Sequence, residues 1–171
     1  MHAKHGISGG RPIGRTLFGA ALGAVVLAGI NAGLAANAAQ AAGKPTIIKL
    51  TQTGCQFVEP ERGVDHMYKT TRKADCEKIN GRTEDKRLAK HKVMKLKAGT
   101  YVFRVKNKNV PYMLGFYLRG QGLRRFTLPG TSGGGLHKGV SRDYKITLKP
   151  GKYIYSCPLN TTPNYEIHVE G

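Results

Sequence analysis

Hydrophobic and polar residues alternate with a period of two along much of the chain, which is typical of β-strands. The clearest example is residues 100–107, where the apolar side chains of Phe103 and Val105 are each followed by a charged one, Arg104 and Lys106. The same pattern predicts strands at residues 46–53, 93–99, 100–107, 112–118, 140–148, 153–157 and 164–170. Short strands, frequent turn signals and little helical periodicity favour an all-β fold, an antiparallel Greek-key β-sandwich.

Two segments interrupt this alternation. Residues 62–92 are rich in charged side chains and poor in apolar ones, and they are too long for a simple connection between strands. We predict an insertion with a short helical turn at 75–81, ended by Asn80 and Gly81, and a second helical piece at 82–92. Residues 121–138 are rich in glycine and are predicted to contain no strand; without a Lys-Ser/Thr signature or a following helix they are not a phosphate-binding loop.

The first 41 residues have the features of a secretory signal peptide. Lys4, Arg11 and Arg15 precede an apolar run at 17–34, and small residues follow at the expected cleavage position after Ala41. No twin-arginine pair occurs, which favours the general secretory route and a periplasmic location. The alternative is a retained membrane anchor, because a run of roughly 20 apolar residues can span a bilayer. Residues 42–171 then form one domain.

The predicted domain is strongly basic. The whole chain has 28 Lys and Arg, 10 Asp and Glu and a net charge of +18, and only three of these charged residues, all basic, lie in the leader. Such a positive field attracts an acidic periplasmic redox or transport protein, or an anionic membrane surface. An exported chain without a nucleic-acid-binding motif is not expected to bind nucleic acid.

Export also affects how the three cysteines are interpreted. Cys55, Cys76 and Cys157 enter an oxidising compartment where disulfides persist. Three is an odd number, so at most one intramolecular bridge forms and one thiol is left over.

The order of motifs resembles that of cupredoxin-like domains. Gly54-Cys55 ends the first strand, residues 97–103 read Lys-Ala-Gly-Thr-Tyr-Val-Phe, and residues 148–157 read Leu-Lys-Pro-Gly-Lys-Tyr-Ile-Tyr-Ser-Cys. The chain is most similar to the cupredoxin-like domain of the periplasmic component of bacterial ferrous-iron uptake systems, through Cys55, the Glu59-Pro60 neighbourhood and the loop at 157–163. The insertion at 62–92 lies outside this resemblance.

The resemblance implies a metal site with Cys157 as the central ligand. Residues after Cys157 supply neither the His nor the Met of a standard blue-copper site, so other donors are needed. Cys55 is a second thiolate candidate, and the adjacent His66 and Met67 suit copper. Glu59 is a harder ligand that suits iron(III) or copper(II). The predicted function is therefore binding of copper, or less favourably iron, for metal carriage or electron transfer.

Two disulfide pairings stay open. In the cupredoxin arrangement Cys55 and Cys157 approach each other and can bridge, whereas pairing of Cys55 with Cys76 leaves Cys157 free for a metal. The first pairing belongs to a rival hypothesis, a non-metal structural or interaction module that docks on an acidic protein or membrane surface. No nucleophile-and-base arrangement is evident, so an enzyme is not expected.

Overall fold

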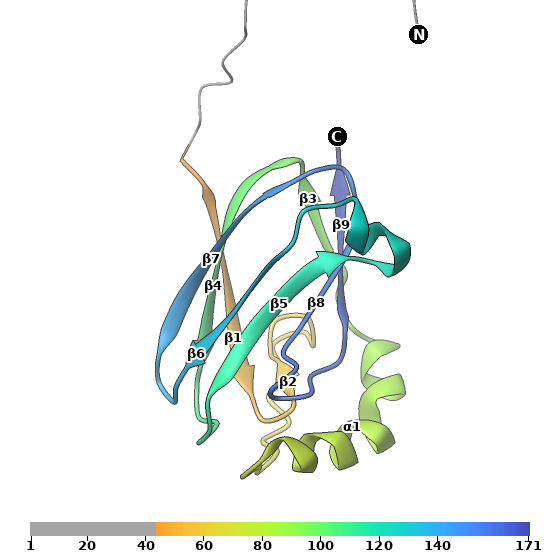
Figure 1. The fold of residues 1–171 in the computed structure, drawn as a ribbon. Helices are drawn as coiled ribbons and strands as arrows, with labels where there is room; N and C mark the ends of the chain where they lie inside the picture. The colour runs from red at the N-terminus through yellow and green to blue at the C-terminus, as the bar shows by residue number, and fades with distance from the viewer. Residues whose placement is uncertain (1–43) are drawn as a thin grey trace, which may run out of the picture. The chain divides into compact units, whose positions relative to one another are not determined.

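A computed structural model describes residues 44–171 of the protein, and the predicted signal peptide lies outside the described residues (Figure 1). Within the described part, no helix is long and apolar enough to cross a membrane. Both sheets and the core between them lie within residues 44–171, so we expect this part to fold without the leader.

The elements follow one another in the order β1 (Thr46–Thr53), β2 (Gln56–Phe57), α1 (Lys73–Leu88), β3 (Met94–Lys97), β4 (Gly99–Asn107), β5 (Leu114–Gly120), the 3₁₀ helix η1 (Gly122–Phe126), β6 (Thr131–Leu136), β7 (Ser141–Leu148), β8 (Gly151–Ser156) and β9 (Tyr165–Glu170). All seven predicted strands are present, with boundaries shifted by at most two residues.

The strands form two sheets, a four-stranded one in the order β2-β1-β4-β7 and a five-stranded one in the order β3-β9-β8-β5-β6. The predicted β-sandwich with an inserted, partly helical segment is therefore confirmed. The prediction that all pairs are antiparallel was wrong in two places, because β1 runs parallel to β4 and β3 runs parallel to β9. Parallel neighbours need a long connection; the segment that contains α1 lies between β1 and β4, and most of the second half of the chain lies between β3 and β9.

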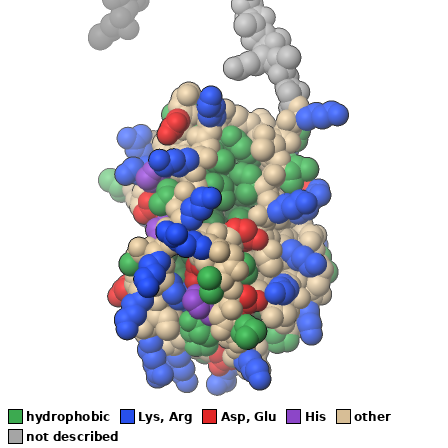
Figure 2. All heavy atoms as spheres, turned by 180° about the vertical axis from the view of Figure 1, so that it is seen from behind, with side chains coloured by type: hydrophobic (Ala, Val, Ile, Leu, Met, Phe, Trp, Pro, Cys, Tyr) green, Lys and Arg blue, Asp and Glu red, His purple; other side chains and the backbone are tan. Residues whose placement is uncertain are grey.

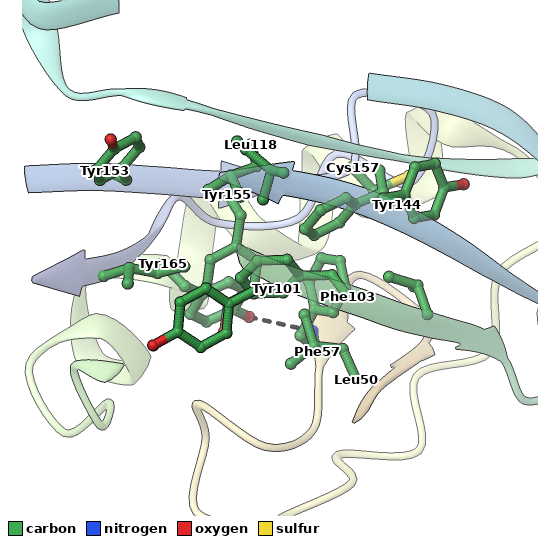
Figure 3. Close-up of a cluster of buried hydrophobic side chains, with 14 of the residues drawn as sticks. Leu50, Phe57, Tyr101, Phe103, Leu118, Tyr144, Tyr153, Tyr155, Cys157 and Tyr165 are labelled. Carbon is green, nitrogen blue, oxygen red and sulfur yellow. Dashed lines mark hydrogen bonds between the residues drawn. The ribbon is translucent and has the colours of Figure 1, made fainter. Parts of the chain in front are cut away.

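The inward-facing side chains of the two sheets meet in an aromatic core (Figure 3). Phe57 is fully buried in it, with edge-to-face contacts to Tyr155 at 5.2 Å and to Tyr165 at 5.9 Å between ring centroids. From the last strand, Ile167 and Val169 are buried in this core. Burial of each large apolar side chain contributes about 1.5–3 kcal/mol.

The insertion contains one continuous helix, so the prediction of two separate helical pieces was wrong. Helix α1 passes through Asn80 and Gly81 without a break. Its buried residues are Cys76, Asn80 and Arg87, which recur at helical spacing on one face. This face is polar, which is why a search for apolar periodicity does not find the helix.

The glycine-rich segment 121–138 contains an edge strand, β6, that the sequence pattern did not predict. It pairs with β5, and the register shifts between Leu114 and Phe116. A Cβ atom on Gly133 would lie 2.9 Å from the Tyr144 ring, and one on Gly115 would lie 2.6 Å from the Gly133 carbonyl oxygen. Glycine is thus required for the close approach of these strands. Because glycine has no side chain, the segment lacks the apolar–polar alternation by which a strand is predicted from sequence.

Candidate functional site

The cysteine-containing end of the sandwich, here called the disulfide pole, is held by a Cys55–Cys76 bridge. The bridge joins the turn after β1 to helix α1, with 4.9 Å between the two Cα atoms. Of the two pairings that the sequence left open, the structure therefore contains Cys55–Cys76 and excludes Cys55–Cys157. Cys55 is bonded to another sulfur and is not a second thiolate for a metal at Cys157.

Cys157 is a free thiol that follows β8, and no part of it is exposed. Figure 3 shows it among the aromatic side chains of the core, with the labelled Tyr144 nearby. The Gly115 backbone N–H donates a hydrogen bond to its Sγ atom at 3.3 Å. Burial raises the pKa of the Cys157 thiol, and the backbone amides of Gly115, Asn160 and Leu159 act in the opposite direction without cancelling it. The protonated thiol is favoured at neutral pH.

Asn160, in the loop after Cys157, connects the parts of the disulfide pole. Its side-chain oxygen accepts hydrogen bonds from the Cys55 N–H and the Tyr112 hydroxyl, both at 3.1 Å. Its amide nitrogen donates to the Thr53 carbonyl at 2.8 Å. Asn160 is fully buried, and these contacts use both ends of its amide. Asn160 is thus a structural amide that joins the loop after Cys157 to the end of β1 and to Tyr112.

A buried ion pair lies beside the pole. Arg87 of α1 binds Glu61 with two donors, from Nη2 to Oε1 at 2.6 Å and from Nε to Oε2 at 2.9 Å. The side chains are only 6% and 3% exposed, respectively. The Tyr165 hydroxyl also donates to Glu61, and His66 Nε2 lies 2.7 Å from its Oε2.

Glu61 is held as a carboxylate by these contacts. Burial alone would raise its pKa, but the hydrogen bonds from Arg87 and Tyr165, the charge of Arg87 and the contact with His66 outweigh burial and lower it. In the sequence Glu61 is simply a second carboxylate beside Pro60, and sequence analysis missed Arg87 entirely. No local signal links these two residues, because they are 26 positions apart.

The other predicted ligands are dispersed and engaged elsewhere. His66 contacts Glu61 and stacks on Tyr68, and Met67 is 77% exposed. Glu59 accepts a hydrogen bond from the Thr51 N–H at 2.8 Å. Among residues 44–171, no group of three or more His, Cys, Asp or Glu side chains is placed to hold one metal ion. A blue-copper site needs a thiolate, two imidazoles and a weak axial ligand, and this donor set does not fit it.

Comparison with known proteins gives only structural neighbours. No protein-family model and no curated protein matches the chain. Auracyanin B covers 74% of this chain and 89% of its own, with a TM-score of 0.45 and 12% identity. The match to auracyanin from Roseiflexus castenholzii covers 75% of this chain and 100% of that auracyanin, with a TM-score of 0.41 and 11% identity. The match to auracyanin A, a "blue" copper protein from Chloroflexus aurantiacus, covers 74% of this chain and 99% of auracyanin A, with a TM-score of 0.39 and 14% identity. Likeness at this level does not transfer a copper site, and the predicted relation to iron-uptake components stays a prediction.

A second candidate site is the outer face of the five-stranded sheet. Register places Lys95, His168 and Lys152 in one row across β3, β9 and β8. The residues before and after each of them along its own strand point inward, and both lysines are exposed. The next row contains Arg119, opposite Ile154. We call Lys95, Lys97, Lys152 and Arg119, together with Arg124 and Arg125 of η1, the basic face.

Counter-charges on the basic face are few. Glu166 and Glu170 of β9 are the carboxylates that the register brings to this side of the sheet, and Glu166 contacts His168 at 3.1 Å. Figure 2 shows that Lys and Arg side chains also outnumber Asp and Glu on the side of the molecule turned away from the viewer in Figure 1. The sequence predicted the net charge but not this arrangement, which depends on the strand order.

Proposed function

We propose that the protein is a non-catalytic docking module that binds an anionic partner through the basic face, and that the disulfide pole stabilises the fold. The main support is the excess of exposed cationic side chains over carboxylates on the basic face. A rigid sheet that presents like charges in rows has an unfavourable self-energy, which an anionic partner relieves. The predicted leader would place this interaction outside the cytoplasm.

The contacts at the disulfide pole support a structural role for it. Cys55 and Cys76 are used by the disulfide, Asn160 by backbone groups and Glu61 by Arg87. These groups are buried and mutually satisfied, so binding a ligand there would first require breaking existing bonds. The basic face, in contrast, presents several exposed cationic side chains and few carboxylates.

A charge-reversal experiment tests the docking function. We expect Lys95→Glu combined with Lys152→Glu in residues 42–171 to weaken binding to a carboxymethyl-dextran surface by roughly tenfold or more at low salt, since each basic group near an anionic surface contributes about 1 kcal/mol. Surface plasmon resonance at several salt concentrations measures the effect.

The matched control is Lys49→Glu combined with Lys145→Glu, two exposed positions on the four-stranded sheet. It changes the net charge by the same amount and should weaken binding much less. Equal losses in the two double variants would mean that net charge alone drives binding, and would contradict a specific docking face.

A second candidate function is copper(I) binding at Cys157, which Gln52 favours. Gln52 Nε2 donates to the Gly115 carbonyl at 2.7 Å, on the residue whose N–H contacts the Cys157 sulfur. The side-chain oxygen of Gln52 is buried and has no hydrogen-bond partner. The Cys157 thiol is a soft donor that suits copper(I), and the unpaired polar atom of Gln52 leaves the hydrogen bonding around Gly115 incomplete; the amide oxygen is a hard donor, so the pair does not make a blue-copper centre.

We expect a copper(I) competition titration to decide between these functions. If Cys157 binds copper(I), wild-type protein will compete with a chromogenic chelator, while Cys157→Ser will lose about tenfold or more of that affinity because the soft thiolate ligand is gone. A Met67→Leu variant is the control, since its exposed thioether is remote from the core. Failure of the wild type to compete, or equal competition by Cys157→Ser, would eliminate this second candidate.

A further inference from the structure

We propose that the 3₁₀ helix η1 inserts its two exposed apolar side chains into an anionic lipid bilayer and so orients the basic face on the membrane. This inference rests on the proposed docking function and names the partner. The inserting residues are Leu123 and Phe126, and the lipid-binding charges are Arg124 and Arg125 between them.

Leu123 and Phe126 have unusual exposure for large apolar residues. They are 83% and 72% exposed, respectively. Both come from the short segment Gly122–Phe126, which leaves the end of β5 and stands out from the sheet in Figure 1. Exposed apolar side chains this close together on a soluble surface indicate a contact site.

The base of η1 is firmly attached, so the two side chains are presented by a rigid projection. The Gln121 N–H donates to the Lys152 carbonyl at 3.0 Å, and the Leu128 N–H donates to the Arg124 carbonyl at 2.9 Å. Leu128 packs against the core and approaches Gly151 so closely that a Cβ there would lie 2.8 Å from its Cδ1 atom. The projection therefore does not collapse onto the sheet to hide its apolar tip.

Positive charge surrounds this tip. The Arg125 guanidinium lies 4.7 Å from the centroid of the Phe126 ring, and that of Arg119 lies 4.3 Å from the Tyr117 ring. Burial lowers the pKa of Arg119, and the positive charge of nearby Arg125 lowers it further. No Asp or Glu occurs anywhere between residues 86 and 142. The arginines of η1 thus have no acidic neighbour in their own segment to neutralise them.

The shape of the tip favours a bilayer over an acidic protein. A stable protein interface needs roughly 800 Å² on each partner with a packed apolar centre, which two side chains on a narrow projection do not supply. Interfacial membrane binding needs only a few apolar side chains at the depth of the acyl boundary and cations at the headgroups. Leu123, Phe126 and the flanking arginines match the second requirement.

Vesicle co-sedimentation tests the proposal. The probe is a set of unilamellar vesicles of phosphatidylglycerol and phosphatidylcholine, compared with pure phosphatidylcholine, and the protein is residues 42–171. We expect binding to the anionic vesicles only. Leu123→Ser combined with Phe126→Ser should weaken it by about tenfold or more, because two large apolar groups lose their burial. The control, Ile47→Ser combined with Val64→Ser, removes two other half-exposed apolar side chains and should change little.

The dextran surface separates this proposal from the docking function on which it rests. The Leu123/Phe126 double variant should bind carboxymethyl-dextran as the wild type does, since that polymer has no apolar interior. Wild-type binding to dextran without binding to anionic vesicles, or vesicle binding that is insensitive to the two Ser substitutions, would overturn the lipid proposal and leave docking intact. Loss of both activities only on charge reversal, with tip substitutions silent, would show that binding is purely electrostatic and would overturn insertion of the η1 side chains.

Discussion

Replacement of Glu61 by Gln is expected to lower the free energy of unfolding by about 3–5 kcal/mol, because it leaves the Arg87 charge buried without a partner. Both side chains are almost fully buried, so water does not replace the missing carboxylate. The Tyr165 hydroxyl and His66 contact different carboxylate oxygens of Glu61, and the single amide oxygen of Gln can accept from only one of them. Urea denaturation of residues 42–171, followed by circular dichroism, measures the loss.

The matched control is Asp143→Asn, which removes the carboxylate partner of Arg104. That pair has similar geometry, with Nη2–Oδ2 at 2.7 Å, but its side chains are 44% and 47% exposed. An exposed pair contributes at most about 1 kcal/mol. Equal destabilisation by the two substitutions would show that burial of the Glu61–Arg87 pair has no special effect. A Glu61→Leu and Arg87→Met double variant should recover part of the loss, since it leaves no buried charge.

The Glu61 contribution should also depend on pH. The pKa of Glu61 is lower in the folded protein than its ordinary value of 4.5. A lowered folded-state pKa means that the stabilisation is fully present above the unfolded pKa and is lost as the pH falls through the folded value. The difference in stability between wild type and Glu61→Gln should therefore be constant near neutral pH and shrink below about pH 4.5.

Removal of the Cys55–Cys76 disulfide is the second large expected effect. In the chain-entropy model a bridge across 21 positions contributes about 3 kcal/mol, so Cys55→Ala combined with Cys76→Ala should lose roughly that amount. Helix α1 should become mobile first, because the residues it buries are Cys76, Asn80 and Arg87 and none is a large apolar group. Urea denaturation reports the loss of stability, and amide hydrogen exchange reports the release of α1.

A reductant provides the control for this prediction. Wild type and a Cys157→Ala variant both retain the bridge and should lose the same stability on reduction, whereas the Cys55/Cys76 double variant should not respond. Unchanged stability of reduced wild type, or exchange that is slow throughout α1 in the double variant, would contradict a stabilising role for the bridge.

Prediction from sequence succeeded where the burial of side chains follows from the pattern of apolar and polar residues within one short segment. Alternation located β4 and β9, because successive strand residues point to opposite sides of a sheet. It failed for α1, whose buried stripe is polar, and for β6, whose glycines have no side chains to alternate. Gly81 was taken as a helix end, but it is exposed and nothing opposes its place in a continuous helix.

The candidate site was less predictable than the fold. The position of Cys157 after a strand could be read from the sequence, but its partners could not. Whether Cys55 bonds to Cys76 or Cys157 depends on where the insertion lies in space, and the insertion was outside the family resemblance. His66 and Met67 are adjacent in the sequence, yet one contacts Glu61 and the other is in solvent.

The sequence by itself determined the β-sandwich and the basic charge, because the first follows from a period of two residues and the second from composition. Only the tertiary structure decided the cysteine pairing, the burial of Glu61 against Arg87 and the alignment of lysines across β3, β9 and β8. These features join residues far apart in the chain. The Glu61–Arg87 pair depends on how far its charges are removed from water, and the alignment of the lysines depends on the order of the strands in the sheet. Neither can be predicted from a short stretch of sequence.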